Sequence, residues 1–178
     1  MFDNKDNQKV RGSVDIKLFS PTGELKESRF IPNLVVQHGK NYIATRMLGT
    51  TTQTALSTTS TLTSCMTHMA IGTGTATAAV TDIILSQEVP LGNDIVSSAR
   101  APLNSTTQTT GVVTYIATFG TNNPQRTVTS NTTAITEAAI FNSSQSAIAG
   151  TMLCRTTFNP VNKGNDDTLQ ITWTITVS

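Results

Sequence analysis

The sequence has little charge and few aromatic side chains. Only 13% of its 178 residues are charged, 5% are aromatic, and the formal net charge is +1. An average globular domain is about one quarter charged, and a near-neutral chain is not suited to binding nucleic acid by neutralising phosphates. No apolar run reaches the roughly 18 residues of a membrane span. Residues 1–10 lack the apolar stretch of a secretory signal. We therefore expect no nucleic-acid partner, no membrane span and no such signal.

Cysteine is also scarce. The two cysteines, Cys65 and Cys154, cannot make a disulfide scaffold. A single bond between them is conceivable, but nothing in the sequence implies it, and a buried thiol is the simpler interpretation of Cys154 within a predicted strand. With His38 and His68 they form four potential zinc ligands, of which only Cys65 and His68 are closely spaced. We expect no metal and no other cofactor.

Hydroxyl side chains supply the polarity that charge usually provides, with 34 threonines and 15 serines. The branched Cβ of threonine fits a pleated sheet while its hydroxyl stays hydrated. The charges concentrate in residues 1–46, which hold eight basic and five acidic side chains, against four and six in the remaining 132 residues. A surface with so little charge repels its neighbours weakly, which favours a protein held in an assembly. The alternative is a neutral extracellular or viral β-protein with no special surface.

Alternation of apolar and polar residues predicts an all-β chain. It is clearest in 168–178, where Leu169, Ile171, Trp173, Ile175 and Val177 share one face. Further strands are predicted at 13–19, 25–31, 66–72, 94–100, 111–120, 134–142 and 151–158. A helix of two to three turns is predicted to end at Leu48 before Gly49, and a looser helical turn around 80–87. Seven or eight short strands with Gly, Asn and Pro turns predict an antiparallel β-sandwich or jelly-roll-like barrel.

These patterns divide the chain into four segments. They are a flexible N-terminal arm (1–12), a β-hairpin plus short helix (13–49), a Thr/Ser-rich loop (50–65) and a β-sandwich domain (66–178). Residues 159–167, after the predicted strand 151–158, are expected to form a loop. The expected core of the sandwich consists of Trp173, Ile171, Ile175, Phe119 and Phe141.

No combination of residues stands out as a catalytic site. The stretch GTGTAT (72–77) lacks the third small residue of a dinucleotide fingerprint and the Gly-Lys-Ser/Thr of a phosphate loop. Gly72 and Gly74 are therefore predicted to form the turn after strand 66–72. Cys65, His68 and Asp82 can be combined on paper as a nucleophilic triad, but 49 hydroxyl side chains make chance combinations common. We expect no enzymatic activity.

Two further patterns resemble binding sites but lack a required feature. Asp166-Asp167 follow NKGN in a stretch typical of a turn, and the alternating acids of a calcium loop are absent. The pattern Thr-x-Thr at 73–77 and 172–176 suggests an ice-binding protein, because such proteins use flat arrays of threonine. A stacked array of this kind needs a repeat of fixed period, and the sequence has none.

Basic residues near the N-terminus are candidates for docking onto an acidic neighbour. They are Lys5, Lys9, Arg11, Lys17, Arg29 and Lys40. The segment up to Arg11 is polar and expected to be flexible in isolation, and it could become ordered by lying on a neighbour. The alternative is that all six are solvated surface charges.

An ordered series of motifs gives the chain a family resemblance. HMAIGTGTATAAVTDIILSQEV, VTYIATFGT, ITEAAIFNSS and GTMLCRTTFNPVNKGNDDTLQITWTITV are similar to a group of small virion proteins of tailed bacteriophages, across about residues 32–178. Ala139 stands where that family usually has glycine, and Ile83 where it has threonine. The resemblance implies a non-enzymatic structural protein of the virion with an all-β domain, assembled in the cytoplasm of the host bacterium.

The resemblance also implies partners, namely the major capsid protein or tail proteins and further copies of this chain. Two placements stay open. A head decoration or cement protein bracing the shell fits the short length, the lack of a long shaft and the charged arm. A tail, collar, baseplate or fibre component could use the loops 50–64 and 104–110 to contact the host. An enzyme such as a cell-wall hydrolase would depend on Asp82, Glu88 or Glu137.

Overall fold

A computed structural model describes residues 9–48, 52–54, 59–61, 65–89, 100–124, 132–144 and 150–177. Its strands are β1 (Val10–Phe19), β2 (Leu25–Val35), β3 (Thr52–Thr54), β4 (Thr59–Thr61), β5 (His68–Gly72), β6 (Ala101–Pro102), β7 (Ser105–Thr109), β8 (Val112–Phe119), β9 (Thr132–Phe141), β10 (Met152–Gly164) and β11 (Thr168–Val177). The one helix among these residues, α1 (Gln37–Leu48), is too short and too polar to cross a membrane.

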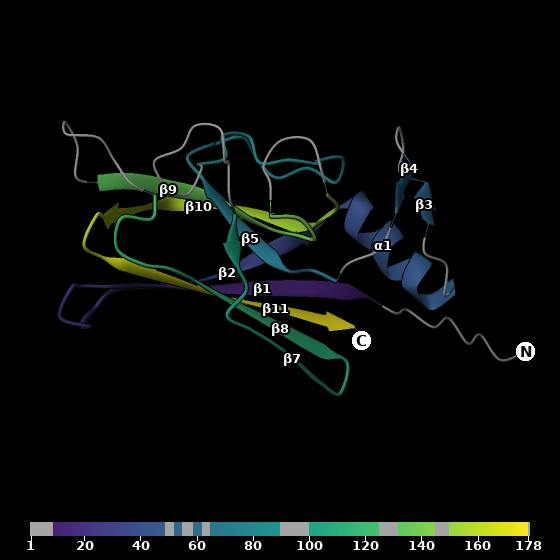
Figure 1. The fold of residues 1–178 in the computed structure, drawn as a ribbon, viewed down its shortest axis with the longest axis horizontal. Coiled ribbons are helices and arrows are strands. Elements are labelled where there is room, and N and C mark those ends of the chain that lie inside the picture. The colour runs from purple at the N-terminus through teal and green to yellow at the C-terminus, as the bar shows by residue number, and fades with distance from the viewer. Residues whose placement is uncertain are drawn as a thin grey trace, which may run out of the picture.

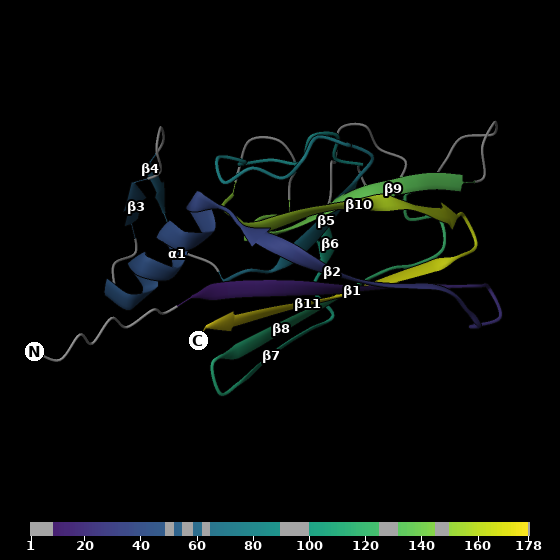
Figure 2. The same cartoon turned by 180° about the vertical axis from the view of Figure 1, so that it is seen from behind.

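Nine strands form one antiparallel sheet in the order β6-β5-β9-β10-β2-β1-β11-β8-β7, and β3 and β4 form a separate small hairpin. The sheet curls so that β5, β9 and β10 lie in one layer and β1, β11, β8 and β7 in the other, as both views show (Figures 1 and 2). β2 connects the layers because it pairs with β1 along most of its length and with β10 only at Leu34 and Val35. The predicted all-β antiparallel fold with one short helix is confirmed.

The main core lies between the two layers. The inward side chains of β11, from Leu169 to Ile175, are at most 4% exposed, and the alternating threonines face outward. Trp173 and Phe119 are fully buried in this core, as predicted. Phe141 is buried in a second cluster, with Val36, Ala70, Leu85, Ala139 and Met152. The sequence placed Phe141 with Trp173 because nothing in it showed that β9 is covered on both faces.

Several local predictions differ from the structure. β10 continues to Gly164, so most of the predicted loop 159–167 is strand, with a register shift between Thr157 and Val161 that accommodates Pro160. β7 occupies the predicted loop 104–110, and β3 and β4 lie in the predicted loop 50–65. Residues 80–87 form turns and no helix.

The segments predicted from the sequence are joined by the sheet. β1 pairs with β11 over ten residues, so the N-terminal hairpin and residues 66–178 share one sheet. Residues 10–12 of the predicted arm belong to β1. Residues 1–8, Gly49 and all of the predicted strand 94–100 except Arg100 lie outside the described residues.

Candidate functional site

Residues 73–89, called the covering loop here, lie over the outer face of the layer formed by β5, β9 and β10 (teal in Figure 1). The loop returns alongside its own start, where Thr73 N donates to Gln87 O at 3.0 Å and Val89 N donates to Ile71 O at 2.9 Å. Leu85 of the loop is buried in the cluster that contains Phe141. The loop therefore covers a second hydrophobic core.

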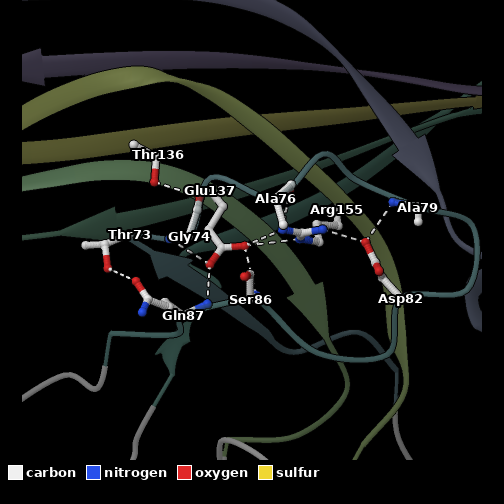
Figure 3. Close-up of polar contacts among 10 residues, drawn as sticks. All are labelled: Thr73, Gly74, Ala76, Ala79, Asp82, Ser86, Gln87, Thr136, Glu137 and Arg155. Carbon is white, nitrogen blue, oxygen red and sulfur yellow. Dashed lines mark hydrogen bonds and ion pairs between the residues drawn. The ribbon is translucent and has the colours of Figure 1, made fainter.

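A buried carboxylate binds the covering loop to the sheet (Figure 3). Glu137 projects from β9 and is 0% exposed. Its Oε1 accepts hydrogen bonds from Gly74 N at 3.1 Å and Gln87 N at 2.7 Å, and its Oε2 accepts one from Ser86 N at 3.0 Å. Because a buried carboxylate must recover the hydration it loses, these three backbone donors fix the loop around it.

Arg155 of β10 completes the cluster from the other side. Its Nε and Nη2 donate to Glu137 Oε2 at 3.1 and 2.7 Å, and its Nη1 donates to Asp82 Oδ2 at 2.5 Å. Nη2 also donates to Ala76 O at 2.8 Å, and Ala79 N donates to Asp82 Oδ2 at 2.8 Å. Burial alone lowers the pKa of Arg155, but the hydrogen bonds and charges of Glu137 and Asp82 outweigh it, so the pKa is raised and the guanidinium stays charged.

Gly72 and Gly74 lie at the predicted turn after β5, and the structure gives them a further role. A Cβ at Gly72 would collide with Gln87 O and the Glu137 carboxylate, and one at Gly74 would collide with Glu137 and Ser86. Thr136 Oγ1 donates to Gly74 O at 2.8 Å. The glycines therefore allow the covering loop to approach the buried carboxylate closely.

A second ion pair fixes the end of the covering loop. Arg100 is 4% exposed and donates to both carboxylate oxygens of Glu88, at 2.9 and 3.0 Å. Its guanidinium lies over the Phe141 ring, 3.4 Å from the ring centroid. Glu88 in turn forms a β-bridge with Gly72. Both ends of the loop are therefore attached to the same layer of the sheet.

The middle of the covering loop presents apolar side chains to solvent. Val80, Ile83 and Ile84, called the apolar tip here, are each about half exposed (47%, 51% and 48%). They flank Asp82 in the sequence, and Gln37 N at the start of α1 donates to Val80 O at 2.8 Å. Grouped exposed apolar side chains mark interaction surfaces. Here the backbone that carries them is held in place by the buried charges.

The described part of residues 66–178 turns its charges inward. It contains Asp82, Glu88, Arg100, Glu137, Arg155, Lys163, Asp166 and Asp167, and all except the exposed Asp166 have ion-pair or hydrogen-bond partners within the chain.

Two of these charges lie away from the covering loop. Lys163 is 2% exposed and donates to Gly120 O at 2.8 Å, and burial lowers its pKa to about 8. Asp167 pairs with Lys26 at 2.7 Å. Burial raises the pKa of Asp167, but hydrogen bonds from Lys26 and Gly164 N outweigh that effect and lower it.

The proposed docking residues fall into two groups. Lys17 pairs with Asp15 at 3.1 Å, and Arg29 pairs with Glu27 and donates to the carbonyl oxygens of Asn159 and Pro160, so both have partners within the chain. Lys9, Arg11 and Lys40 are exposed. Arg11 and Lys40 line one surface depression of about 280 Å³ beside Asn33. Lys5 lies outside the described residues.

The other candidate residues are not brought together. Cys65 is exposed, Cys154 is buried, and both are free thiols. Burial raises the pKa of Cys154 well above its usual value. His68 Nδ1 lies 2.8 Å from Thr67 Oγ1, while Asp82 binds Arg155. Burial, with the charge of Arg100, lowers the pKa of His68. Among the described residues, no group of three or more His, Cys, Asp or Glu side chains is placed to hold a metal ion.

The comparisons with known proteins found no match to any family model, curated protein or solved structure. The buried cluster draws on three separate stretches of this sequence. Gly72, Gly74, Asp82, Glu137 and Arg155 come from these stretches and meet in one buried site. Together they hold the covering loop in one conformation.

Proposed function

We propose that this chain is a non-enzymatic structural protein of a tailed-phage particle, bound to the head as a decoration or cement protein. The observation that supports this most is the fixed apolar tip, displayed by a domain whose own charges are turned inward. A surface of this kind repels neighbouring subunits weakly. It also binds at little cost in ordering, because its conformation is set beforehand.

The surface near α1 combines two kinds of contact. Gln37, in the first turn of α1, bonds to Val80 of the apolar tip, and Lys40, one turn later, lines the depression that also contains Arg11. An acidic neighbour with an apolar patch would complement both. Because exposed charges are screened by salt, the contribution of Arg11 and Lys40 predicts that binding to the particle weakens as salt rises.

The non-enzymatic proposal is supported by the contacts of the three carboxylates considered for catalysis. Asp82 and Glu137 are bound to Arg155, and Glu88 is bound to Arg100. Each has a structural use in holding the covering loop. Cleavage of peptidoglycan or polysaccharide by the purified protein, abolished in a folded Glu88→Gln variant, would overturn this part of the proposal.

A tail, collar, baseplate or fibre position is the second candidate, and one observation favours it. The outer face of β11, β8 and β7 carries hydroxyl side chains in register, such as Thr174 beside Thr114 and Thr114 beside Thr107, with no charged residue on these strands. A neutral hydroxyl face of this kind is suited to contacts with a host surface.

Copy number separates the two positions. Quantitative mass spectrometry of purified particles should give on the order of hundreds of copies for a head decoration protein, because such proteins follow the symmetry of the shell. About a dozen copies or fewer would place the protein in the tail. Absence of the chain from purified particles would overturn the whole proposal.

A binding assay tests the apolar tip directly. Purified protein is added back to particles that lack it, and the bound fraction is measured after sedimentation. Ile83→Asp should reduce binding about tenfold or more, since it buries a charge in the contact. Thr75→Asp, an exposed position on the same loop, is the matched control and should bind as the wild type does. Equal binding by Ile83→Asp would show that the apolar tip is not the contact.

A further inference from the structure

The sheet has open strand edges, and most of them are protected against pairing with another chain. β6 is only two residues long and ends in a proline. Along residues 25–33, β2 has no strand partner on the side away from β1 among the described residues. This stretch carries Lys26, Glu27, Arg29 and Pro32. Arg29 also reaches across to β10, where it donates to Asn159 O and Pro160 O. Charges and proline are the usual means of blocking an edge.

The edge formed by β7 has none of these protections. In the described part of the chain, β7 is the last strand of the sheet and pairs only with β8. Its sequence, Ser-Thr-Thr-Gln-Thr, contains no charge and no proline, and residues 106–109 are exposed. The chain has no charged residue anywhere from Ala101 to Asn123. The backbone N–H and C=O groups on the outer side of β7 can therefore accept a further strand without electrostatic repulsion.

We propose that β7 pairs with β7 of a second copy of this chain, antiparallel, about a two-fold axis at Thr107. This register places Thr107 opposite Thr107, Ser105 opposite Thr109, and Thr106 opposite Gln108. Every pair then joins hydroxyl or amide groups, and Thr–Thr cross-strand pairs are favourable. The strand is complementary to itself, which a two-fold interface requires.

Pairing at this edge also extends a surface that already exists. Thr107 lies opposite Thr114 of β8, which lies opposite Thr174 of β11, so one row of hydroxyls crosses three strands of the outer face. The second copy continues this row across the two-fold axis. The inference concerns the purified chain in solution and does not depend on the proposed function.

Sedimentation velocity of the purified full chain tests the proposal. At about 100 µM, a concentration suited to small interfaces, the wild type should sediment as a dimer of the 18.9 kDa chain. Thr107→Lys and Thr107→Glu should each weaken dimerisation about tenfold or more, because like charges then face each other across the axis. An equimolar mixture of the two variants should restore a dimer.

Ser28→Lys is the matched control, because Ser28 is exposed on β2 at the opposite edge of the same layer. It should dimerise as the wild type does. Thermal melts check that every variant is folded, and Thr107→Arg replaces Thr107→Lys if the lysine variant does not fold. A monomeric wild type, a dimer that is equally stable in Thr107→Lys, or a mixture of opposite charges that stays monomeric would overturn the proposal.

Discussion

Replacing Glu137 by glutamine tests whether the buried cluster holds the covering loop in place. The carboxylate accepts five hydrogen bonds, three from backbone N–H groups of the loop and two from Arg155. Glutamine has nearly the same shape, but its NH2 group would face donors at either oxygen position. At least two of the bonds are lost, and the Arg155 guanidinium is left without its fully buried partner.

Removing one partner of a buried, hydrogen-bonded ion pair costs about 3–5 kcal/mol. The folding free energy of a typical domain is about 5–15 kcal/mol, so we expect Glu137→Gln to remove about a fifth or more of the stability. For a chain of this size the melting temperature should fall by about 6–20 °C. The effect should be largest in the covering loop, because three of the five donors lie there.

Urea unfolding followed by tryptophan fluorescence measures the loss, since Trp173 is the only tryptophan and is fully buried. Hydrogen exchange should show faster exchange of the amides of Gly74, Ser86 and Gln87. Glu24→Gln, an exposed carboxylate in the turn between β1 and β2, is the control and should change stability by less than about 0.5 kcal/mol.

A double variant tests how much of the lost stability comes from the ion pair between Glu137 and Arg155. Adding Arg155→Met to Glu137→Gln should recover part of the lost stability, because it removes a buried guanidinium that has lost its Glu137 partner and keeps only the partly exposed Asp82. A Glu137→Gln protein that loses less than about 1 kcal/mol, or whose loop amides keep their protection, would refute the reasoning that this cluster fixes the loop.

Three further predictions follow from other buried groups. Trp173→Ala should lower the free energy of unfolding by about 3–5 kcal/mol, measured by urea unfolding with circular dichroism. A loss of less than about 1 kcal/mol would show that Trp173 is not part of the core. The pKa of Lys163 is about 8 in the folded protein against an ordinary 10.5. The unfolded chain therefore holds the Lys163 proton more tightly than the folded chain does. Between pH 8 and 10.5 the free energy of unfolding should rise relative to that of Lys163→Met, by no more than about 3 kcal/mol. A difference between the two proteins that does not change with pH would contradict this. A thiol reagent should titrate one cysteine in the native protein and two in denaturant, because Cys65 is exposed and Cys154 is buried with a raised pKa; two native equivalents would show that Cys154 is accessible.

The sequence predicts strands well where one face is buried and the other is solvated. The alternation of β11 identifies its inward residues, including Trp173, because the pleat makes a period of two visible. β7 was missed because all of its residues are polar and an edge strand of this kind has no apolar side to detect. The sequence predicts a loop for the second half of β10 because Asn159 and Pro160 resemble a turn, whereas in the structure they lie at an irregularity in its pairing with β9.

The buried cluster was not predicted, although the sequence contains one usable signal. Glu137 and Arg155 each interrupt an apolar stretch, AITEAAIF and TMLCRTTF, and a lone charge in a strand buried on both faces requires a partner. Which charges pair cannot be read from the sequence, because Glu137 and Arg155 are 18 positions apart and only the antiparallel register brings them together.

The shortage of charge is greater at the surface than the composition indicates, because five of the eight charged side chains in the described part of residues 66–178 are buried. Buried ion pairs add little stability compared with apolar packing, so their value here is the single conformation that they impose on the covering loop. The same shortage leaves β7 without the charges that protect β2. A free monomer would gain solubility from the opposite arrangement, with charges outside and apolar contacts within. The arrangement of this chain suits a protein whose neutral surfaces are covered by neighbours, and the two proposals together therefore predict that its apolar tip and its β7 edge are both buried in an assembly.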